Sequence, residues 1–129
     1  MELTEDIALR AYAKMMNTLS TEPLEAILAD DFIYESQMVA EPLNSKQAFL
    51  DYIVPKLQTI QRLNATVYAE MGSVSAYREN QPCIILAQND KANLVGLVLA
   101  KTDGKALKRL DLCIVPSPES AERSGEYPT

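Results

Sequence analysis

Residues 29–39 read Ala29-Asp-Asp-Phe-Ile-Tyr-Glu-Ser-Gln-Met-Val39, an acidic pair followed by an alternating stretch. We expect Asp30 and Asp31 to end a helix. From Phe32 onward the pattern predicts a strand, because successive side chains of a strand point to opposite faces. One face would carry Phe32, Tyr34, Ser36 and Met38, and the other Ile33, Glu35, Gln37 and Val39.

Helical patterns lie on both sides of this stretch. Apolar residues at three- and four-residue steps, among them Tyr12 and Met15, predict a helix from about Thr4 to Leu19. A short helix is expected over residues 22–29, with Pro23 in its first turn. A third begins with a capping box at Asn44, and Pro55 should kink it or end it early.

The second half of the chain predicts antiparallel strands over 63–71, 82–88, 93–101 and 105–115, with a hairpin turn at Asp103-Gly104. Residues 72–81 fit either a polar connection or a bulged strand. This order of elements predicts an α+β fold with a mostly antiparallel sheet. We expect one domain over residues 1–115 and a mobile tail over 116–129, which has little to bury.

Composition excludes several classes of function. A net charge of −6 and scattered basic residues argue against nucleic acid and anionic membranes as partners. No apolar run is long enough for a transmembrane helix, and the acidic N-terminus is unlike a signal peptide, so we expect a cytoplasmic protein. Cys83 and Cys113 lie in apolar strands and are expected to be buried free thiols.

The chain has no histidine, which excludes Ser-His-Asp and Cys-His pairs and the usual zinc sites. Adjacent carboxylates at Asp30 and Asp31 do not make a magnesium site by themselves. We expect neither a metal nor a cofactor. Any acid–base chemistry must use Asp, Glu, Tyr, Lys or Cys side chains.

Several of these features resemble the nuclear-transport-factor-2-like (NTF2-like) superfamily, which includes ketosteroid isomerases and the SnoaL-like polyketide cyclases. They are Tyr12 with Asn17 five residues on, Asp30-Asp31 before the first strand, Asn44 at the start of a helix, and Gly104-Lys105 in a turn. The resemblance covers roughly residues 4–115. It implies a cystatin-like α+β cone, in which three N-terminal helices pack on a curved, mostly antiparallel sheet.

The resemblance also implies a largely apolar pocket between the sheet and the helices. The side chains facing it would be Tyr12, Tyr34, Ser36, Met38, Arg109, Asp111 and Cys113. Tyr12 matches the tyrosine that donates to the oxyanion in ketosteroid isomerase. The general base of that enzyme falls on Ser36, and its second oxyanion donor falls near Leu97 and Val98, so isomerase chemistry of that kind is not expected.

Arg109 and Asp111 are two residues apart on one strand and therefore share a face. If the protein is an enzyme of the isomerase, cyclase or hydrolase type, Asp111 is the expected proton acceptor, Tyr12 the donor to developing negative charge, and Arg109 the positioning residue. The alternatives are a plain ion pair at positions 109 and 111, and a core tyrosine at position 12.

A small, largely apolar ligand would rest on Met15 and Met38, with its polar end near Arg109, Tyr12 and Ser36. Three classes of function stay open: an enzyme, a non-catalytic ligand-binding module, and a structural or protein-interaction module.

Residues Leu94–Ala100 and Ile84–Leu86 are apolar on both faces. A sheet covered by helices on one side should be polar on the other. We therefore expect the outer face to be covered by a second subunit in a homodimer. The alternative is that the C-terminal tail folds over this surface.

Overall fold

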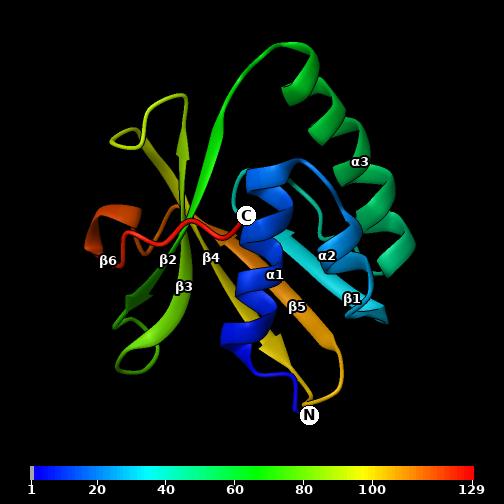
Figure 1. Ribbon diagram of the computed structural model, residues 1–129. Coiled ribbons are helices and arrows are strands. Elements are labelled where there is room, and N and C mark those ends of the chain that lie inside the picture. Colours follow the sequence, from blue (N-terminus) through cyan, green and yellow to red (C-terminus); the bar gives the residue numbers. More distant parts are fainter. Residues whose placement is uncertain (1) are drawn as a thin grey trace.

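The computed structural model describes residues 2–129 and has an α+β fold with three helices and a six-stranded sheet (Figure 1). The elements are α1 (Glu5–Thr18), α2 (Glu22–Glu25), β1 (Leu28–Ser36), α3 (Lys46–Arg62), β2 (Val67–Val74), β3 (Gln81–Gln88), β4 (Leu94–Thr102), β5 (Leu107–Cys113), a 3-10 turn η1 (Pro118–Ser120) and β6 (Glu122–Arg123). In the described part of the chain, no helix is long and apolar enough to cross a membrane.

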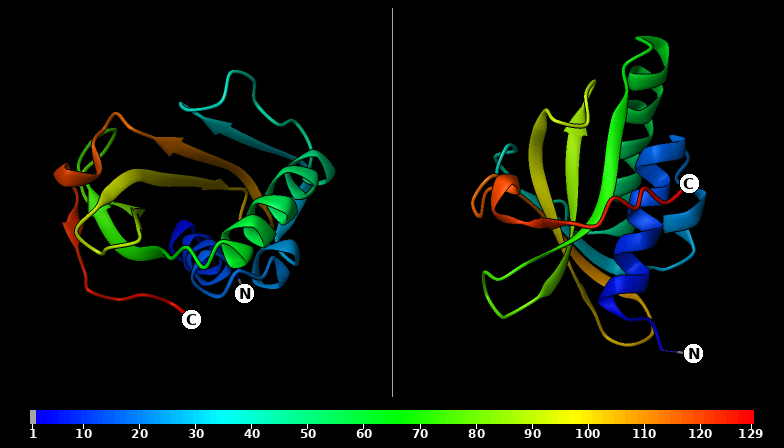
Figure 2. Two further views of the ribbon diagram at one scale, coloured as in Figure 1. Left: turned by 90° about the horizontal axis from the view of Figure 1, so that it is seen from above. Right: turned by 60° about the vertical axis from the view of Figure 1, so that its left-hand side comes forward.

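The strands lie in the order β1-β5-β4-β3-β2-β6. Strands β1 and β5 are parallel, and the other neighbours among the described residues are antiparallel. The sheet is therefore mostly antiparallel, as the sequence predicts. The sheet is strongly bent (Figure 2). Helix α1 packs across β2, β3 and β4, whereas α3 packs against β1. The helices therefore cover one face of the sheet, which we call the helix-covered face.

Helix α1 forms where its apolar period predicts. The Thr4 hydroxyl oxygen accepts a hydrogen bond from the backbone N–H of Ile7 at 3.2 Å, and so caps the helix. Tyr12 and Met15 are buried on its inner face. Helix α3 is capped by Ser45, one residue after the predicted Asn44. Pro55 does not end it, and the helix continues to Arg62, with Ile53 and Leu57 buried on both sides of the proline.

Two predicted boundaries are wrong. Helix α2 ends at Glu25, and β1 begins at Leu28, so that Asp30 and Asp31 lie inside a strand. An edge strand tolerates such residues because one side of it is open to water, and Asp31 is paired there with Lys108 at 2.5 Å. Strand β2 extends to Val74, so residues 72–74 follow the strand alternative that the sequence left open for 72–81.

Alternation along the strands divides the apolar side chains between two clusters. Ile84, Val98, Leu110 and Leu112 belong to the main core under the helices. The opposite face, which we call the helix-free face, carries a second buried cluster, composed of Val74, Cys83, Ile85, Leu97, Leu99 and Cys113. Ala121 packs against this cluster, and Pro118 in η1 is buried. The C-terminal segment thus lies over part of the helix-free face, which is the alternative to a covering subunit.

The segment expected to be a mobile tail instead has defined partners. Strand β6 pairs with β2, and the last residues run across α1, where Asn17 Nδ2 donates to the carbonyl oxygen of Pro128 at 2.7 Å (Figure 1). The expectation rested on apolar burial, but this segment is held by polar contacts.

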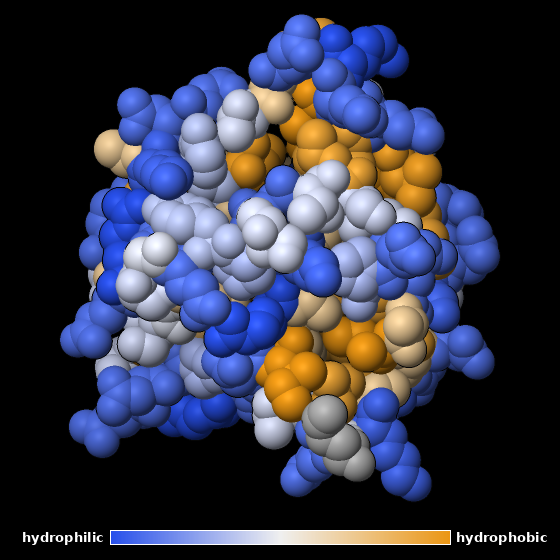
Figure 3. Space-filling model, in the orientation of Figure 1, coloured by the Kyte–Doolittle hydropathy of each residue, from blue (hydrophilic) through white to orange (hydrophobic). Residues whose placement is uncertain are grey.

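Elsewhere on the same side of the molecule, hydrophobic surface gathers beside α3 and near the start of α1 (Figure 3).

Candidate functional site

A pocket of about 780 Å³ opens where β1 and β5 end. Strands β4 and β5 contribute side chains from the helix-free face, and the loops after β1 and β2 form the rim. We call it the sheet pocket. It is lined by Glu35, Ser36, Gln37, Val39, Ala40, Pro42, Tyr77, Arg78, Gln81, Leu99, Lys101, Arg109, Asp111, Leu112 and Cys113.

Arg109 is at the centre of a charged cluster in this pocket. The parallel register of β1 and β5 sets Glu35 beside Asp111, and the antiparallel register of β4 and β5 sets Lys101 beside Arg109. Arg109 Nε donates to Asp111 Oδ1 at 3.1 Å and Oδ2 at 3.0 Å, and another guanidinium nitrogen lies 2.8 Å from Glu35 Oε2. These contacts, the hydrogen bond with Asp111 first, raise the pKa of Arg109.

Gln81 lines the same pocket and carries an unsatisfied acceptor. Its side chain is 7% exposed, and its Oε1 has no hydrogen-bond partner within the described residues. A buried carbonyl oxygen without a donor is costly, and such groups are rare in native proteins. The sequence carries a signal for this residue. Gln81 is a polar residue in phase with Cys83 and Ile85, two side chains that the strand buries.

A second group of polar side chains lies under the helices. Tyr34 stacks at 5.7 Å from the ring of Tyr52, and Lys56 Nζ donates to the Tyr52 hydroxyl at 3.2 Å. Tyr12 is buried in the same core. Burial, followed by nearby phenols, raises the pKa of both Tyr12 and Tyr34 well above the ordinary value. Phe32, Phe49 and Met15 are fully buried in this core, so the protein's own side chains fill it.

Solved structures resemble this chain in fold. A SnoaL-like protein of unknown function from Burkholderia thailandensis is 15% identical, with a TM-score of 0.61, and the match covers 97% of this chain and 100% of that one. An NTF2-like protein of unknown function from Cytophaga hutchinsonii is 11% identical, with a TM-score of 0.57 and coverages of 90% and 96%. The chain has the NTF2-like fold.

A protein from Kribbella flavida named as a candidate ketosteroid isomerase also has this fold, at 17% identity, a TM-score of 0.57, and coverages of 84% and 76%. No protein-family model matches the sequence, and no curated protein matches it significantly. At sequence identities this low, the matches show a shared fold and nothing about activity.

The NTF2-like architecture does not bring the expected site residues together. Tyr12, Tyr34 and Met15 are buried under the helices, whereas Arg109, Asp111 and Cys113 line the sheet pocket on the opposite face. The expectation that all of them face one cavity is therefore wrong. Strand β5 alternates, and because Leu110 and Leu112 pack under the helices, Arg109, Asp111 and Cys113 must point the other way.

Two further expected residues lie near the pocket. Ser36 is buried at its margin, where its Oγ accepts a hydrogen bond from the backbone N–H of Met38 at 3.1 Å. Met38 is 56% exposed and does not line the pocket. A smaller pocket of about 370 Å³ beside α1 and α2 is lined by neither Tyr12 nor Met15. Residues 2–129 contain no cluster of three His, Cys, Asp or Glu side chains able to hold a metal ion.

Proposed function

We propose that this NTF2-like protein binds a small, partly apolar molecule in the sheet pocket. The observation that carries the proposal is the unpartnered, buried Oε1 of Gln81, which a hydroxyl or N–H group of a bound molecule would satisfy. Pockets of several hundred Å³ with apolar walls and a few polar groups are the usual form of a small-molecule site. Leu99 and Val39 supply apolar lining here.

The charged cluster limits which ligand fits. Arg109 is held by two carboxylates, so it orients Asp111 and Glu35 rather than acting as a free clamp for an anion. Lys101 lies beside Arg109 and has no ion pair within the described residues. A ligand with a hydroxyl or N–H group for Gln81 suits the site, and its apolar body would lie on Leu99 and Val39.

An acid–base role rests on Asp111 alone, because Tyr12 lies on the other face of the sheet. Both carboxylate oxygens of Asp111 already accept hydrogen bonds from Arg109, so the side chain is engaged in an ion pair. This favours binding over catalysis. Asp111→Asn tests the catalytic role. An enzyme that uses Asp111 as base would lose turnover and keep ligand affinity, whereas turnover that survives the change would exclude Asp111 as the base.

The binding proposal is tested with a library of small aromatic and alicyclic alcohols, amines and carboxylic acids. Binding is followed by two-dimensional NMR of the ¹⁵N-labelled protein. We expect ligands to shift the amide signals of Gln81 and Asp111 and to leave those of Lys14 and Thr18 in place. Gln81→Leu should weaken the binding of alcohols about tenfold. Gln81→Glu keeps an acceptor at this position and should leave their affinity unchanged. Ligands that bind both variants equally well would rule out the proposed role of Gln81.

A homodimer through the helix-free face is the second candidate. Val39 and Tyr77 line the pocket rim and are 38% and 75% exposed, with Met38 beside them. Apolar side chains of this kind are typical of protein interfaces. Val39→Glu with Tyr77→Glu should convert a dimer into a monomer in sedimentation experiments. Leu63→Glu, at an exposed apolar position outside the pocket, is the matched control. A 14.3 kDa species for the unmodified protein at micromolar concentration would exclude this dimer.

A further inference from the structure

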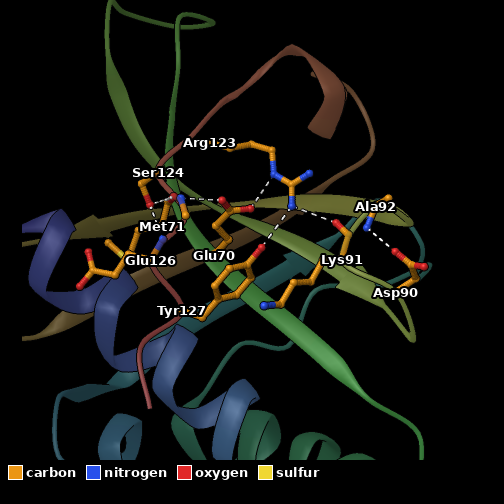
Figure 4. Close-up of polar contacts among 10 residues, drawn as sticks. Glu70, Met71, Asp90, Lys91, Ala92, Arg123, Ser124, Glu126 and Tyr127 are labelled. Atoms are coloured by element: carbon orange, nitrogen blue, oxygen red, sulfur yellow. Dashed lines mark hydrogen bonds and ion pairs between the residues drawn. The ribbon is translucent and has the colours of Figure 1, made fainter.

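The C-terminal arm, which we define as residues 118–129, adds a strand to the free edge of β2 (Figure 4). Ser73 pairs with Glu122, and Gly72 with Arg123. Beyond β6, the N–H of Met71 donates to the carbonyl oxygen of Glu126 at 2.9 Å, and the N–H of Ser124 donates to the carbonyl oxygen of Met71 at 3.2 Å. The arm therefore provides hydrogen-bond partners for backbone groups at the edge of β2, which would otherwise be open to another strand.

Glu70 makes this edge selective for the arm. Its side chain is 3% exposed, and the arm supplies both of its partners: Arg123 Nε donates to Oε1 at 2.7 Å, and the N–H of Gly125 donates to Oε2 at 2.8 Å. Arg123 also donates to the Lys91 carbonyl oxygen at 2.9 Å and contacts the Tyr127 hydroxyl at 3.2 Å (Figure 4). An occupant without an arginine at this position would leave a buried carboxylate unpaired.

Asn17 of α1 adds contacts to the surface that holds the arm, near the end of the arm. Its side-chain amide bonds both backbone groups of Ala69, at 2.8 and 2.9 Å, as a neighbouring strand would. The same amide nitrogen donates to the carbonyl oxygen of Pro128 at 2.7 Å. The receptor thus consists of the β2 edge, Glu70 and Asn17, and it makes contacts with residues 122–128 of the arm.

The arm itself buries little apolar surface. Residues 122–126 are all exposed, and among the apolar residues of the arm Pro118 is buried. Strand addition gains its affinity from main-chain hydrogen bonds and its specificity from side-chain contacts such as that of Arg123. Every one of these contacts would form equally well with the arm of another copy, because the sequences are identical.

The connection between β5 and the arm exposes two large apolar side chains. Ile114 and Val115 are 46% and 72% exposed, although both are large and apolar. The neighbouring strand residues Leu112 and Cys113 are buried. If two chains exchanged arms, their two connections would run past each other, and these side chains would be covered.

We propose that the C-terminal arm is exchangeable, so that the β2 edge of one copy accepts the arm of a second copy, with residues 114–117 as the hinge. Reciprocal exchange gives a closed two-fold dimer. The contacts made in the two forms are the same, so protein concentration and the hinge decide between them. This proposal does not depend on a ligand in the sheet pocket, or on contact between the helix-free faces.

The test uses two full-length variants, each with one added cysteine at a paired position. One carries Ser73→Cys, and the other carries Glu122→Cys. The two are mixed at high concentration, incubated, oxidised mildly and run on a non-reducing gel. We expect a disulfide-linked dimer in the mixture that exceeds the amount in either variant alone. Adding Arg123→Gln to the Glu122→Cys chain should abolish most of this excess, because Glu70 then lacks its charged partner.

The double variant Ser73→Cys/Glu122→Cys controls for geometry, since it should link within one chain at low concentration. If it links while the mixture stays unlinked, the arm does not exchange. A spin label gives a second readout that needs no disulfide. A nitroxide at position 122 of one chain should broaden the Ser73 amide signal of a ¹⁵N-labelled partner. A Ser73 signal that keeps its full intensity at high concentration would overturn the proposal.

Discussion

Gly72 and Arg123 are direct partners where β2 meets β6, and the arm passes too close to Gly72 to leave room for a side chain. A Cβ atom at position 72 would lie 2.7 Å from the carbonyl oxygen of Glu122 and 2.7 Å from Ile85 Cδ1. The glycine is thus required for the close approach of the arm to the sheet.

Gly72→Ala should therefore loosen the arm. The new methyl group must displace either the backbone of β6 or the buried Ile85, and such overpacking costs about 1–3 kcal/mol of unfolding free energy. Urea denaturation measures this loss, and trypsin cleavage after Arg123 should become faster. Glu119→Ala, at an exposed position of the same arm, is the control and should change neither. An unchanged cleavage rate in Gly72→Ala would mean that the arm is not held at Gly72.

Asn17→Ala should destabilise the protein by about 1–3 kcal/mol, because it leaves the N–H and C=O of Ala69 without partners at a part-buried edge. Thr18→Ala on the same helix removes one exposed bond to the Lys14 carbonyl and should have a much smaller effect. Denaturant titrations of both variants compare the two. Equal losses would contradict the role of Asn17 as a substitute strand.

Alkaline pH should destabilise the fold through Tyr12 and Tyr34, whose pKa values burial raises above 10.0. Below pH 10 both the folded and unfolded chains keep these phenol protons. As the pH rises further, the unfolded chain releases them while the folded protein holds them, so the stability they contribute is progressively lost. Ultraviolet titration should show these two phenols ionising late or only on unfolding. Tyr12→Phe should flatten the loss of stability above pH 10.

The two thiols should resist alkylation. Burial raises the pKa of Cys83 to about 12, and burial together with the charge of Asp111 raises the pKa of Cys113. Iodoacetamide at pH 8 should label both cysteines slowly in the folded protein and rapidly in urea. Asp111→Asn removes the nearby negative charge and should speed labelling of Cys113 but not of Cys83, as mass spectrometry of the peptides can show. Equal acceleration at both positions would indicate general loosening instead.

Local patterns predicted much of the fold. The apolar period of α1, the alternation of the later strands and the order of elements were sufficient for an α+β fold with a mostly antiparallel sheet. Boundaries were less accurate. Asp30 and Asp31 were expected to end a helix but lie in β1, where an edge position and a lysine on the neighbouring strand accommodate them.

The candidate site was predicted only in part. The spacing of Arg109 and Asp111 correctly indicated that their side chains meet. It could not indicate that Gln81, Lys101 and the Tyr77 loop lie beside them, because those neighbours come from other strands and loops. The arm was missed for a related reason. Its stability comes from a buried glutamate 53 residues earlier, not from apolar residues of its own.

Sequence by itself determined that β5 has two unlike faces, one with Leu110 and Leu112 and one with Arg109 and Asp111, because strand side chains alternate. Only the tertiary structure decided which face meets the helices. The more apolar face of β5 packs under α1 and α3, because burying it removes more apolar surface from water. Tyr12 and Asp111 were consequently placed on opposite sides of one sheet.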